Sequence, residues 1–163
     1  MWLASRGGDA PVGRLAPVQG RDRHSHRRIP ITIQFNHTIV GCKANRETAE
    51  FWAEILGLEV GAEWGPFIPL QAGNGVTFDF ANVPPDLPGG IHPTHYAFLV
   101  SEDEFDSAYK KITDHQITYW ADPHGRAEGE INHNDGGRGI YFQDPNGHYM
   151  ELITVPYGGR PQR

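Results

Sequence analysis

The sequence predicts an α+β protein made of two βαβββ modules, which we expect to form a curled mixed sheet around a metal site. Three observations support this fold class. An alternating strand, an amphipathic helix and several short strands occur twice along the chain. An Asn-Gly turn precedes the last strand of both copies, at residues 74–75 and 146–147. A histidine on the first strand and an acid four residues past the turn glycine also recur, which indicates an internal repeat.

Module one is expected over residues 29–82. Its first strand shows alternating apolar residues from Ile31 to Ile39, and its helix presents an apolar face around Trp52. Asn45 is expected to cap this helix and Gly57 to end it, because glycine adopts the left-handed conformation common there. Three short strands are expected within residues 58–64, 67–72 and 75–82.

A linker is predicted over residues 83–93, which contain four prolines and two glycines. Module two follows over residues 94–157. It opens with a strand at residues 94–100, and residues 101–104 form a capping box before a second amphipathic helix. Further strands are expected near residues 117–121, 126–131, 138–143 and 148–155, with a turn at residues 144–147.

Composition narrows the class of protein. The 163 residues suit one domain, and no apolar run approaches the roughly 18–20 residues of a membrane span. The start has no apolar core of the signal-peptide kind, so we expect a cytoplasmic protein. The single cysteine, Cys42, excludes a disulfide framework within the chain and is interpreted as a packed small residue.

The net charge of −6 is unevenly distributed. Residues 1–28 contain six Arg and two Asp, so the rest of the chain is strongly acidic, which argues against nucleic acid as a partner. These residues are rich in Gly, Pro and Arg without apolar periodicity, so we expect a flexible N-terminal extension. Residues 158–163 are interpreted as a C-terminal tail.

Four side chains form a candidate metal site. The first and last strands of each module should be neighbours, so that His37 and Asp79, and likewise His95 and Glu151, face the same side. Packing of the modules about a pseudo-twofold axis would bring all four together. His37, His95 and Glu151 with open positions suit Fe(II) and oxygen chemistry. Adding Asp79, a possible fourth ligand with a shorter side chain, suits Ni, Zn, Mn or Co as a Lewis acid.

Residues 31–157 resemble the vicinal oxygen chelate superfamily, which includes glyoxalase I, bleomycin resistance proteins, fosfomycin-modifying enzymes and extradiol dioxygenases. The ligand positions of that superfamily match His37, His95 and Glu151 in order, with Asp79 at the variable fourth position. The resemblance implies the glyoxalase/bleomycin resistance/dioxygenase fold and a divalent metal. It also implies a small-molecule substrate and a homodimer, whose sites would lie either within one chain or at the interface.

The C-terminal half is similar to the extradiol dioxygenase signature. The match comprises His133, Tyr141, the turn Asp144-Pro145-Asn146-Gly147 and Glu151 at the expected spacings. The resemblance implies that His133 is an acid/base and that Tyr141 donates a hydrogen bond to a substrate oxygen. From the residues alone, His133 is equally interpreted as a solvated loop histidine, and Tyr141 as a half-buried strand aromatic.

Three functions are therefore considered. The first is an Fe(II)-dependent extradiol-type dioxygenase acting on a catechol-like small molecule. The second is a glyoxalase-like lyase or isomerase in which Glu151 or Asp79 moves a proton. The third is a metal-free drug-binding protein of the bleomycin resistance kind, which has no need of the ligand set.

Arg138 is expected in a structural salt bridge, and four histidines are expected at the surface or in turns: His92, His115, His124 and His148.

Overall fold

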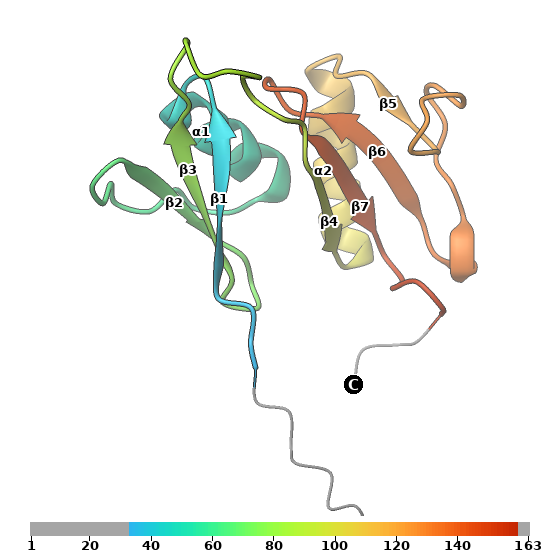
Figure 1. Cartoon of the computed structure of the whole chain (residues 1–163). Coiled ribbons are helices and arrows are strands. Elements are labelled where there is room, and N and C mark those ends of the chain that lie inside the picture. Colours follow the sequence, from blue (N-terminus) through green and yellow to red (C-terminus); the bar gives the residue numbers. More distant parts are fainter. Residues whose placement is uncertain (1–32, 160–163) are drawn as a thin grey trace, which may run out of the picture. The chain divides into compact units, whose positions relative to one another are not determined.

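The computed structural model describes residues 33–159, and all of its elements lie in one compact unit that begins at Gln34 (Figure 1). The predicted N-terminal extension and the start of the predicted first strand lie outside the described residues. The elements follow in the order β1 (His37–Cys42), α1 (Asn45–Leu56), β2 (Phe67–Gln71), β3 (Thr77–Asn82), β4 (His95–Leu99), α2 (Glu102–Asp114), β5 (Tyr119–Trp120), the 3-10 helix η1 (Asn134–Gly136), β6 (Gly139–Gln143) and β7 (Tyr149–Ile153).

The strands form two mixed sheets, one for each predicted module. The first sheet has the order β1-β3-β2 and the second the order β4-β7-β6-β5. In each sheet the first strand of the module runs parallel to its last strand, and the remaining pairs are antiparallel. The α+β class and the repeated pairing are therefore as predicted.

Several predicted local features differ from the structure. Residues 58–64 and 126–131 contribute only isolated bridges, Val60 to Leu70, Trp64 to Phe67 and Trp120 to Glu128. The first strand begins at His37, since residues 33–36 precede the paired register that starts at His37 and Thr77. The capping role expected of Asn45 is wrong, because Ala44 occupies the N-cap and Asn45 is already helical.

The helix boundaries otherwise follow the expected chemistry. Gly57 ends α1 with a φ of 69°, a left-handed conformation that favours glycine. At α2, the Ser101 side chain accepts from the Glu104 backbone N–H while the Glu104 carboxylate accepts from the Ser101 backbone N–H. This reciprocal capping satisfies two donors that the first turn would otherwise leave unpaired. No described helix is long and apolar enough to cross a bilayer.

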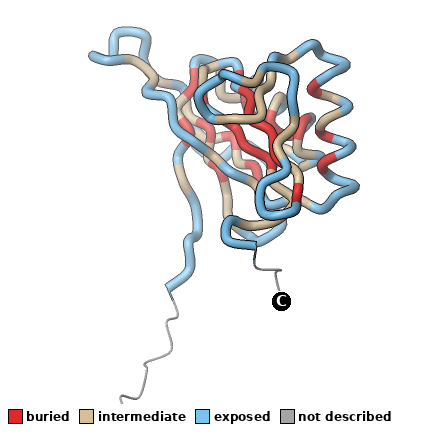
Figure 2. Tube along the Cα trace, turned by 90° about the vertical axis from the view of Figure 1, so that its right-hand side faces the viewer, coloured by how far each residue is buried: buried red, intermediate tan, exposed pale blue. Residues whose placement is uncertain are grey.

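One hydrophobic core joins the two modules, with buried residues concentrated on the inner strands and helix faces (Figure 2). Trp52 of α1 is fully buried at its centre. Its ring contacts Phe80 of its own module at a centroid distance of 5.0 Å and Tyr96 of module two at 5.0 Å. Such edge-to-face contacts add to the stabilisation from burial. Cys42 is buried in the same core, as predicted for a packed small residue.

The turn before β7 anchors module two to module one. The buried Asp144 carboxylate accepts from the Trp52 indole N–H at 3.0 Å and from the backbone N–H groups of Asn146 and His148 at 2.8 and 2.9 Å. The Asn146 side chain accepts from the Lys43 backbone N–H at 2.9 Å and donates to Thr48 at 2.9 Å. The signature turn is therefore a connector between the modules.

His148 is buried, so its predicted place at the surface is wrong. Its Nδ1 accepts from the Thr94 backbone N–H at 3.1 Å, and its Nε2 donates to the Gly41 carbonyl at 2.8 Å. Both partners are distant in sequence, and they fix the ring between the end of β1 and the residue before His95. The other three histidines, His92, His115 and His124, are exposed, as predicted.

Replacing Asp144 with alanine is expected to destabilise the fold. The change leaves the Trp52 indole N–H and two backbone donors without a charged acceptor, which should lower the free energy of unfolding by about 3 kcal/mol. Urea unfolding followed by tryptophan fluorescence measures this change. Asp114→Ala, which removes an exposed pair with Lys110, should cost less than about 0.5 kcal/mol. Equal effects of the two substitutions would contradict the connecting role of Asp144.

Candidate metal centre

In both modules the strand register brings a histidine and an acid to the same sheet face. Asp79 of β3 is in register with Ile39, and Glu151 of β7 is in register with Ala97. In each case the acid lies opposite the residue two positions after the histidine. Residues two apart on a strand share a face, so the repeated spacing of the sequence becomes a repeated geometry. We call this side, opposite the helices, the open face of each sheet.

In module two the histidine and the acid are in contact. His95 Nε2 lies 3.0 Å from Glu151 Oε2. The Glu151 side chain is 1% exposed, whereas that of His95 is 48% exposed. A carboxylate this deeply buried needs a charged or hydrogen-bonding partner. An imidazole nitrogen and a carboxylate oxygen thus converge at the border between the interior and the solvent, and both are donors that divalent transition metals accept.

Two tyrosines complete the surroundings of this carboxylate. The Tyr157 hydroxyl donates to Glu151 Oε1, and the hydroxyl oxygens of Tyr141 and Tyr157 lie 3.0 Å apart. Because the Tyr157 proton is directed at Glu151, Tyr141 donates to the Tyr157 oxygen. Burial, followed by the hydrogen bonds around Glu151, raises the pKa of Tyr141 far above the usual tyrosine range and raises the pKa of Tyr157 as well. Both phenols therefore keep their protons at neutral pH.

In module one the equivalent residues, His37 and Asp79, are both accessible to solvent. His37 is exposed, and its Nδ1 lies 2.8 Å from Asn36 Oδ1. Asp79 is half-buried in the middle of β3. Within residues 33–159, no three His, Cys, Asp or Glu side chains are grouped closely enough to hold a metal ion. The described residues therefore present two separate pairs, which we call half-sites of the candidate centre, with His37 and Asp79 on one sheet and His95 and Glu151 on the other.

His133 lies in the loop before β6, directly ahead of η1. The ring is exposed, and its Nδ1 is 3.3 Å from the Gly137 carbonyl oxygen. Within the described part of the chain it makes no hydrogen bond to His95, Tyr141 or Glu151. Arg138, farther along the same loop, pairs with Glu102 and Asp106 of α2 at 2.5 and 2.6 Å, which is the structural salt bridge expected from the sequence.

Sequence reasoning missed Tyr157. The residue lies six positions past Glu151, beyond the last strand, in the stretch Pro156-Tyr157-Gly158-Gly159. A turn rich in glycine with one aromatic residue is the only signal that could have drawn attention to it. The structure shows that this turn returns over the open face and brings the phenol to the buried carboxylate.

A cavity of about 730 Å³ lies between the two modules along the edge of β4. His95, Ala97 and Leu99 of β4 line one side of it, and Phe35, Thr38 and Phe78 of module one line the other. Its walls are mainly apolar. Of the four candidate ligands, His95 lines this space, which is large enough to admit another chain segment or a small molecule.

Comparison with known proteins identifies the family. Residues 34–152 match the Glyoxalase/Bleomycin resistance protein/Dioxygenase superfamily. The match covers well over half of the chain, so this protein belongs to that superfamily. The α+β fold class predicted from the repeat and the superfamily resemblance noted in the sequence are both confirmed.

The chain is similar to proteins named as transferases and to solved structures named as oxidases, among others. The chain is 30% identical to Glutathione transferase FosA of Serratia marcescens over 72% of its own length and 77% of the relative. It is 27% identical to Metallothiol transferase FosB of Lysinibacillus sphaericus, over 76% and 84% of the two chains. Among solved structures, Oxidase ChaP-H2 is 54% identical with a TM-score of 0.76, covering 80% of this chain and 100% of that one. Oxidase ChaP-H1 is 46% identical with a TM-score of 0.74, covering 78% and 99%.

The raised pKa of Tyr141 has a consequence for stability at high pH. The folded state holds the phenolic proton more tightly than the unfolded chain, whose tyrosines titrate near about 10. The stabilising contribution is therefore complete below that pH and is lost as the pH rises above it. Tyr141→Phe should make the loss of unfolding free energy at alkaline pH less steep. Chemical denaturation at a series of pH values measures the slope, and an unchanged slope would contradict the assignment.

Proposed function

We propose that this protein is a divalent-metal-dependent enzyme, most specifically an Fe(II)-dependent extradiol-type dioxygenase acting on a catechol-like small molecule. The observation that carries the proposal is the convergence of His95 Nε2 and Glu151 Oε2 at 3.0 Å, beside two protonated phenols. His37, in the equivalent position of module one, is the third proposed ligand. Two histidines and one carboxylate with open positions are the donor set of non-haem Fe(II) oxygenases.

The comparisons favour oxygen chemistry over group transfer. The two solved structures that are 46–54% identical to this chain are named oxidases, and the two relatives named transferases are 27–30% identical. The two oxidases are the more similar group, and the match covers nearly the whole of their length. Their names agree with the extradiol signature around Tyr141. We infer that this chain shares the use of O2 and differs from the transferases in its substrate.

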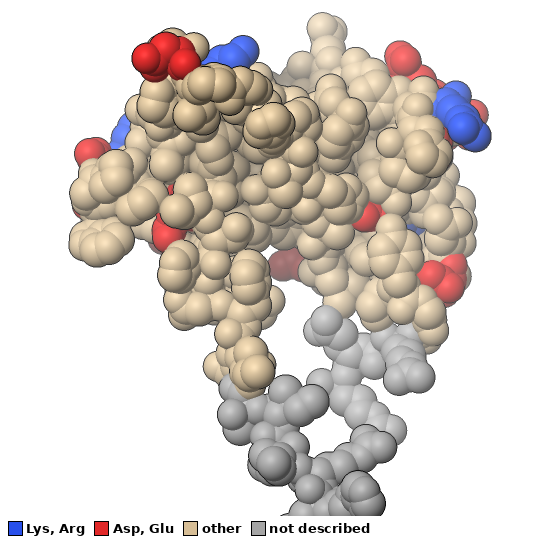
Figure 3. All heavy atoms as spheres, viewed as in Figure 1, with Lys and Arg blue, Asp and Glu red and all other residues tan. Residues whose placement is uncertain are grey.

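We propose further that a second copy of the chain completes the site. Within the described residues, β1 and β4 are edge strands, and these are the strands that carry His37 and His95. Phe35, just before β1, is 69% exposed, and Ile39 of β1 is 57% exposed. The face of the molecule seen in Figure 3 carries mostly uncharged side chains. Unpaired edges with apolar neighbours favour pairing with another strand. In a twofold dimer, β1 of one copy would lie beside β4 of the other and bring His37 to His95 and Glu151.

Each residue then has a defined task. Bound Fe(II) would supply positions at which a catecholate and O2 meet and exchange electrons. His95, Glu151 and His37 would hold the ion. Tyr141 would turn its hydroxyl proton from the Tyr157 oxygen to an oxygen of the bound diol as negative charge develops there. His133 is the proposed acid/base, because an imidazole can accept the diol proton and return it later in the reaction. The small apolar residue Ala97 leaves room beside the ligands.

The second candidate function is Lewis-acid chemistry of the glyoxalase kind. The observation in its favour is the position of Asp79, which shares the open face with His37 just as Glu151 does with His95. In a completed dimer Asp79 would be a fourth ligand or a base that moves a proton on a hydroxy-carbonyl substrate. Such a site would select Ni, Zn, Mn or Co rather than Fe(II).

Metal competition followed by an oxygen assay separates these functions. The full chain, purified anaerobically without a His tag, is offered Fe(II), Mn(II), Ni(II) and Zn(II) together, and bound metal is quantified. We expect about one Fe(II) per chain, as the three-ligand site requires, and O2 uptake when a catechol is added. Glu151→Ala should abolish both, whereas Glu59→Ala, a substitution at an exposed acid, should change neither.

Two other outcomes of the metal competition would favour one of the alternative functions. Retention of Ni(II) or Zn(II) without O2 uptake would contradict the dioxygenase and support the glyoxalase-like function with Asp79 as ligand. Failure to bind any of the four metals would contradict both enzymes and leave a drug-binding protein as the better account.

A further inference from the structure

We propose that Tyr157 is a positioning residue that holds Glu151 in the orientation in which it binds the metal. This inference rests on the proposed metal site and adds to it a residue that lies outside the extradiol signature. The Tyr157 hydroxyl donates a hydrogen bond to one oxygen of the Glu151 carboxylate. The other carboxylate oxygen then faces His95.

The contacts of Glu151 divide its two oxygens. Oε2 lies 3.0 Å from His95 Nε2, and Oε1 accepts the Tyr157 hydroxyl proton. A carboxylate with one oxygen held in this way offers a single oxygen to an ion and cannot rotate freely about its last bond. Carboxylates that bind metals are commonly oriented by such a partner, and loss of the partner typically weakens metal binding by about 10–100-fold.

The exposure of Tyr157 separates this role from simple packing. The residue is 62% exposed, and it does not belong to the hydrophobic core. Its hydroxyl nevertheless reaches a carboxylate that is 1% exposed and accepts from Tyr141 at a 3.0 Å separation of the oxygens. The Tyr157 ring is mostly exposed, so it contributes little to the stability of the core. Its hydroxyl is directed at the buried carboxylate, so its main effect is on the orientation of Glu151.

The backbone that carries Tyr157 is fixed at several points. We call residues 154–159 the C-terminal strap. The Thr154 backbone N–H donates to the Arg138 carbonyl at 2.9 Å, and its Oγ1 accepts from the Arg138 backbone N–H at 2.9 Å. On the far side of Tyr157, the Gly158 backbone N–H donates to Asp135 Oδ2 at 3.3 Å. Tyr157 is therefore held between two anchors that both belong to the loop containing His133.

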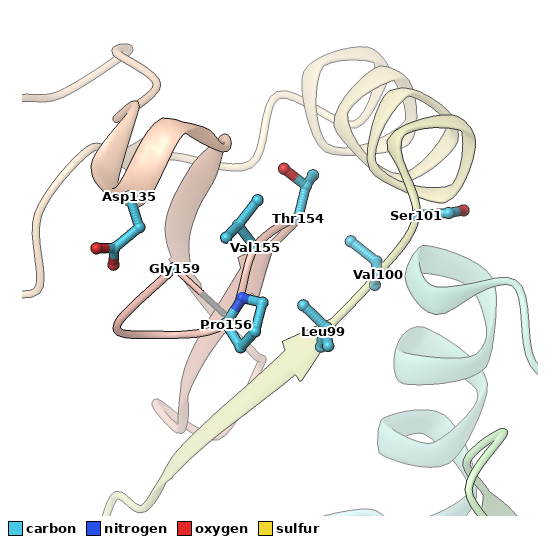
Figure 4. A pocket seen from close by; sticks show the side chains of 8 residues that line it. All are labelled: Leu99, Val100, Ser101, Asp135, Thr154, Val155, Pro156 and Gly159. Atoms are coloured by element: carbon cyan, nitrogen blue, oxygen red, sulfur yellow. The ribbon is translucent and has the colours of Figure 1, made fainter. Parts of the chain in front are cut away.

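Gly137 of the same loop allows the strap to lie close. A Cβ atom at this position would fall 2.8 Å from Val155 Cγ2 and 2.9 Å from Val155 Cβ, closer than carbon atoms approach. Figure 4 shows Val155 and Pro156 of the strap beside Leu99 at the end of β4, around a pocket of about 570 Å³. The strap thus links the His133 loop, the edge of β4 and the Glu151 carboxylate, and a side chain at Gly137 would displace it.

Cobalt binding tests the inference without reference to turnover. The metal-free full chain is titrated with Co(II), whose visible spectrum reports the geometry of its ligands. Tyr157→Phe, which removes only the hydroxyl, should weaken Co(II) binding by about 10–100-fold and alter the spectrum. Because Glu151 Oε1 then lacks its donor, the unfolding midpoint without metal should fall, so Co(II) is added under conditions in which both proteins are fully folded.

The matched control is Tyr109→Phe. Tyr109 also forms a hydroxyl-to-hydroxyl hydrogen bond, with Tyr119 at 2.7 Å, but on the helix side of the same sheet. This substitution should leave Co(II) affinity and spectrum unchanged. Gly137→Ala is a second route to the same effect, and combined with Tyr157→Phe it should weaken binding little further, since both act through the strap.

The outcomes separate this inference from the proposed function. Binding of Co(II) by the unsubstituted chain, its loss in Glu151→Ala and unchanged affinity and spectrum in Tyr157→Phe would overturn the role of Tyr157 alone. An equal loss of binding in Tyr157→Phe and Tyr109→Phe would also overturn it, because the effect would then be general. No Co(II) binding by the unsubstituted chain would overturn the metal site and the inference together.

Discussion

The parallel pairing between the first and last strand of each module is the constraint on which the candidate site depends. It places Glu151 opposite Ala97, so that His95, two residues earlier on the same face, can reach the carboxylate. The same pairing places Asp79 opposite Ile39 and keeps His37 on the matching face. Because β1 and β4 are both edge strands in the described residues, the two histidines lie where another strand can pair. The chain thus carries two pairs of a histidine and an acid, which the proposed dimer would unite in one site.

The signature turn has a structural task as well as a place in a motif. Asp144 binds the Trp52 indole, and His148 links Gly41 to Thr94, the residue before His95. These buried polar contacts are costly to leave unpaired, so they fix how β7 and β4 meet module one. The residues between Tyr141 and Glu151 therefore hold the strands that carry His95 and Glu151 in place, while the Tyr157 hydroxyl contacts the carboxylate directly.

Much of this could be predicted from the sequence because it is local or periodic. The alternation on the strands, the capping box at Ser101 and the left-handed glycine at residue 57 each depend on neighbours within one turn. The repeat then predicts which histidine and acid share a face. Residues 58–64 and 126–131 were harder, because a short apolar pattern does not distinguish a strand from an isolated bridge. The burial of His148 could not be predicted, since it depends on a contact with Gly41, far away in the sequence. The return of Tyr157 to Glu151, six residues earlier, could not be predicted because it depends on how the strap is anchored on Asp135 and Arg138.

The most direct test of a site shared between two copies is the metal content of a defined heterodimer. Chains with His37→Ala and with Glu151→Ala are co-expressed with two different tags that lack histidine, and the mixed dimer is isolated through both tags. Each parent homodimer should hold almost no metal. The mixed dimer should hold about one ion, because one of its two sites combines an intact His37 with an intact His95 and Glu151. A mixed dimer as empty as its parents, or a protein that stays monomeric while binding metal, would contradict the account.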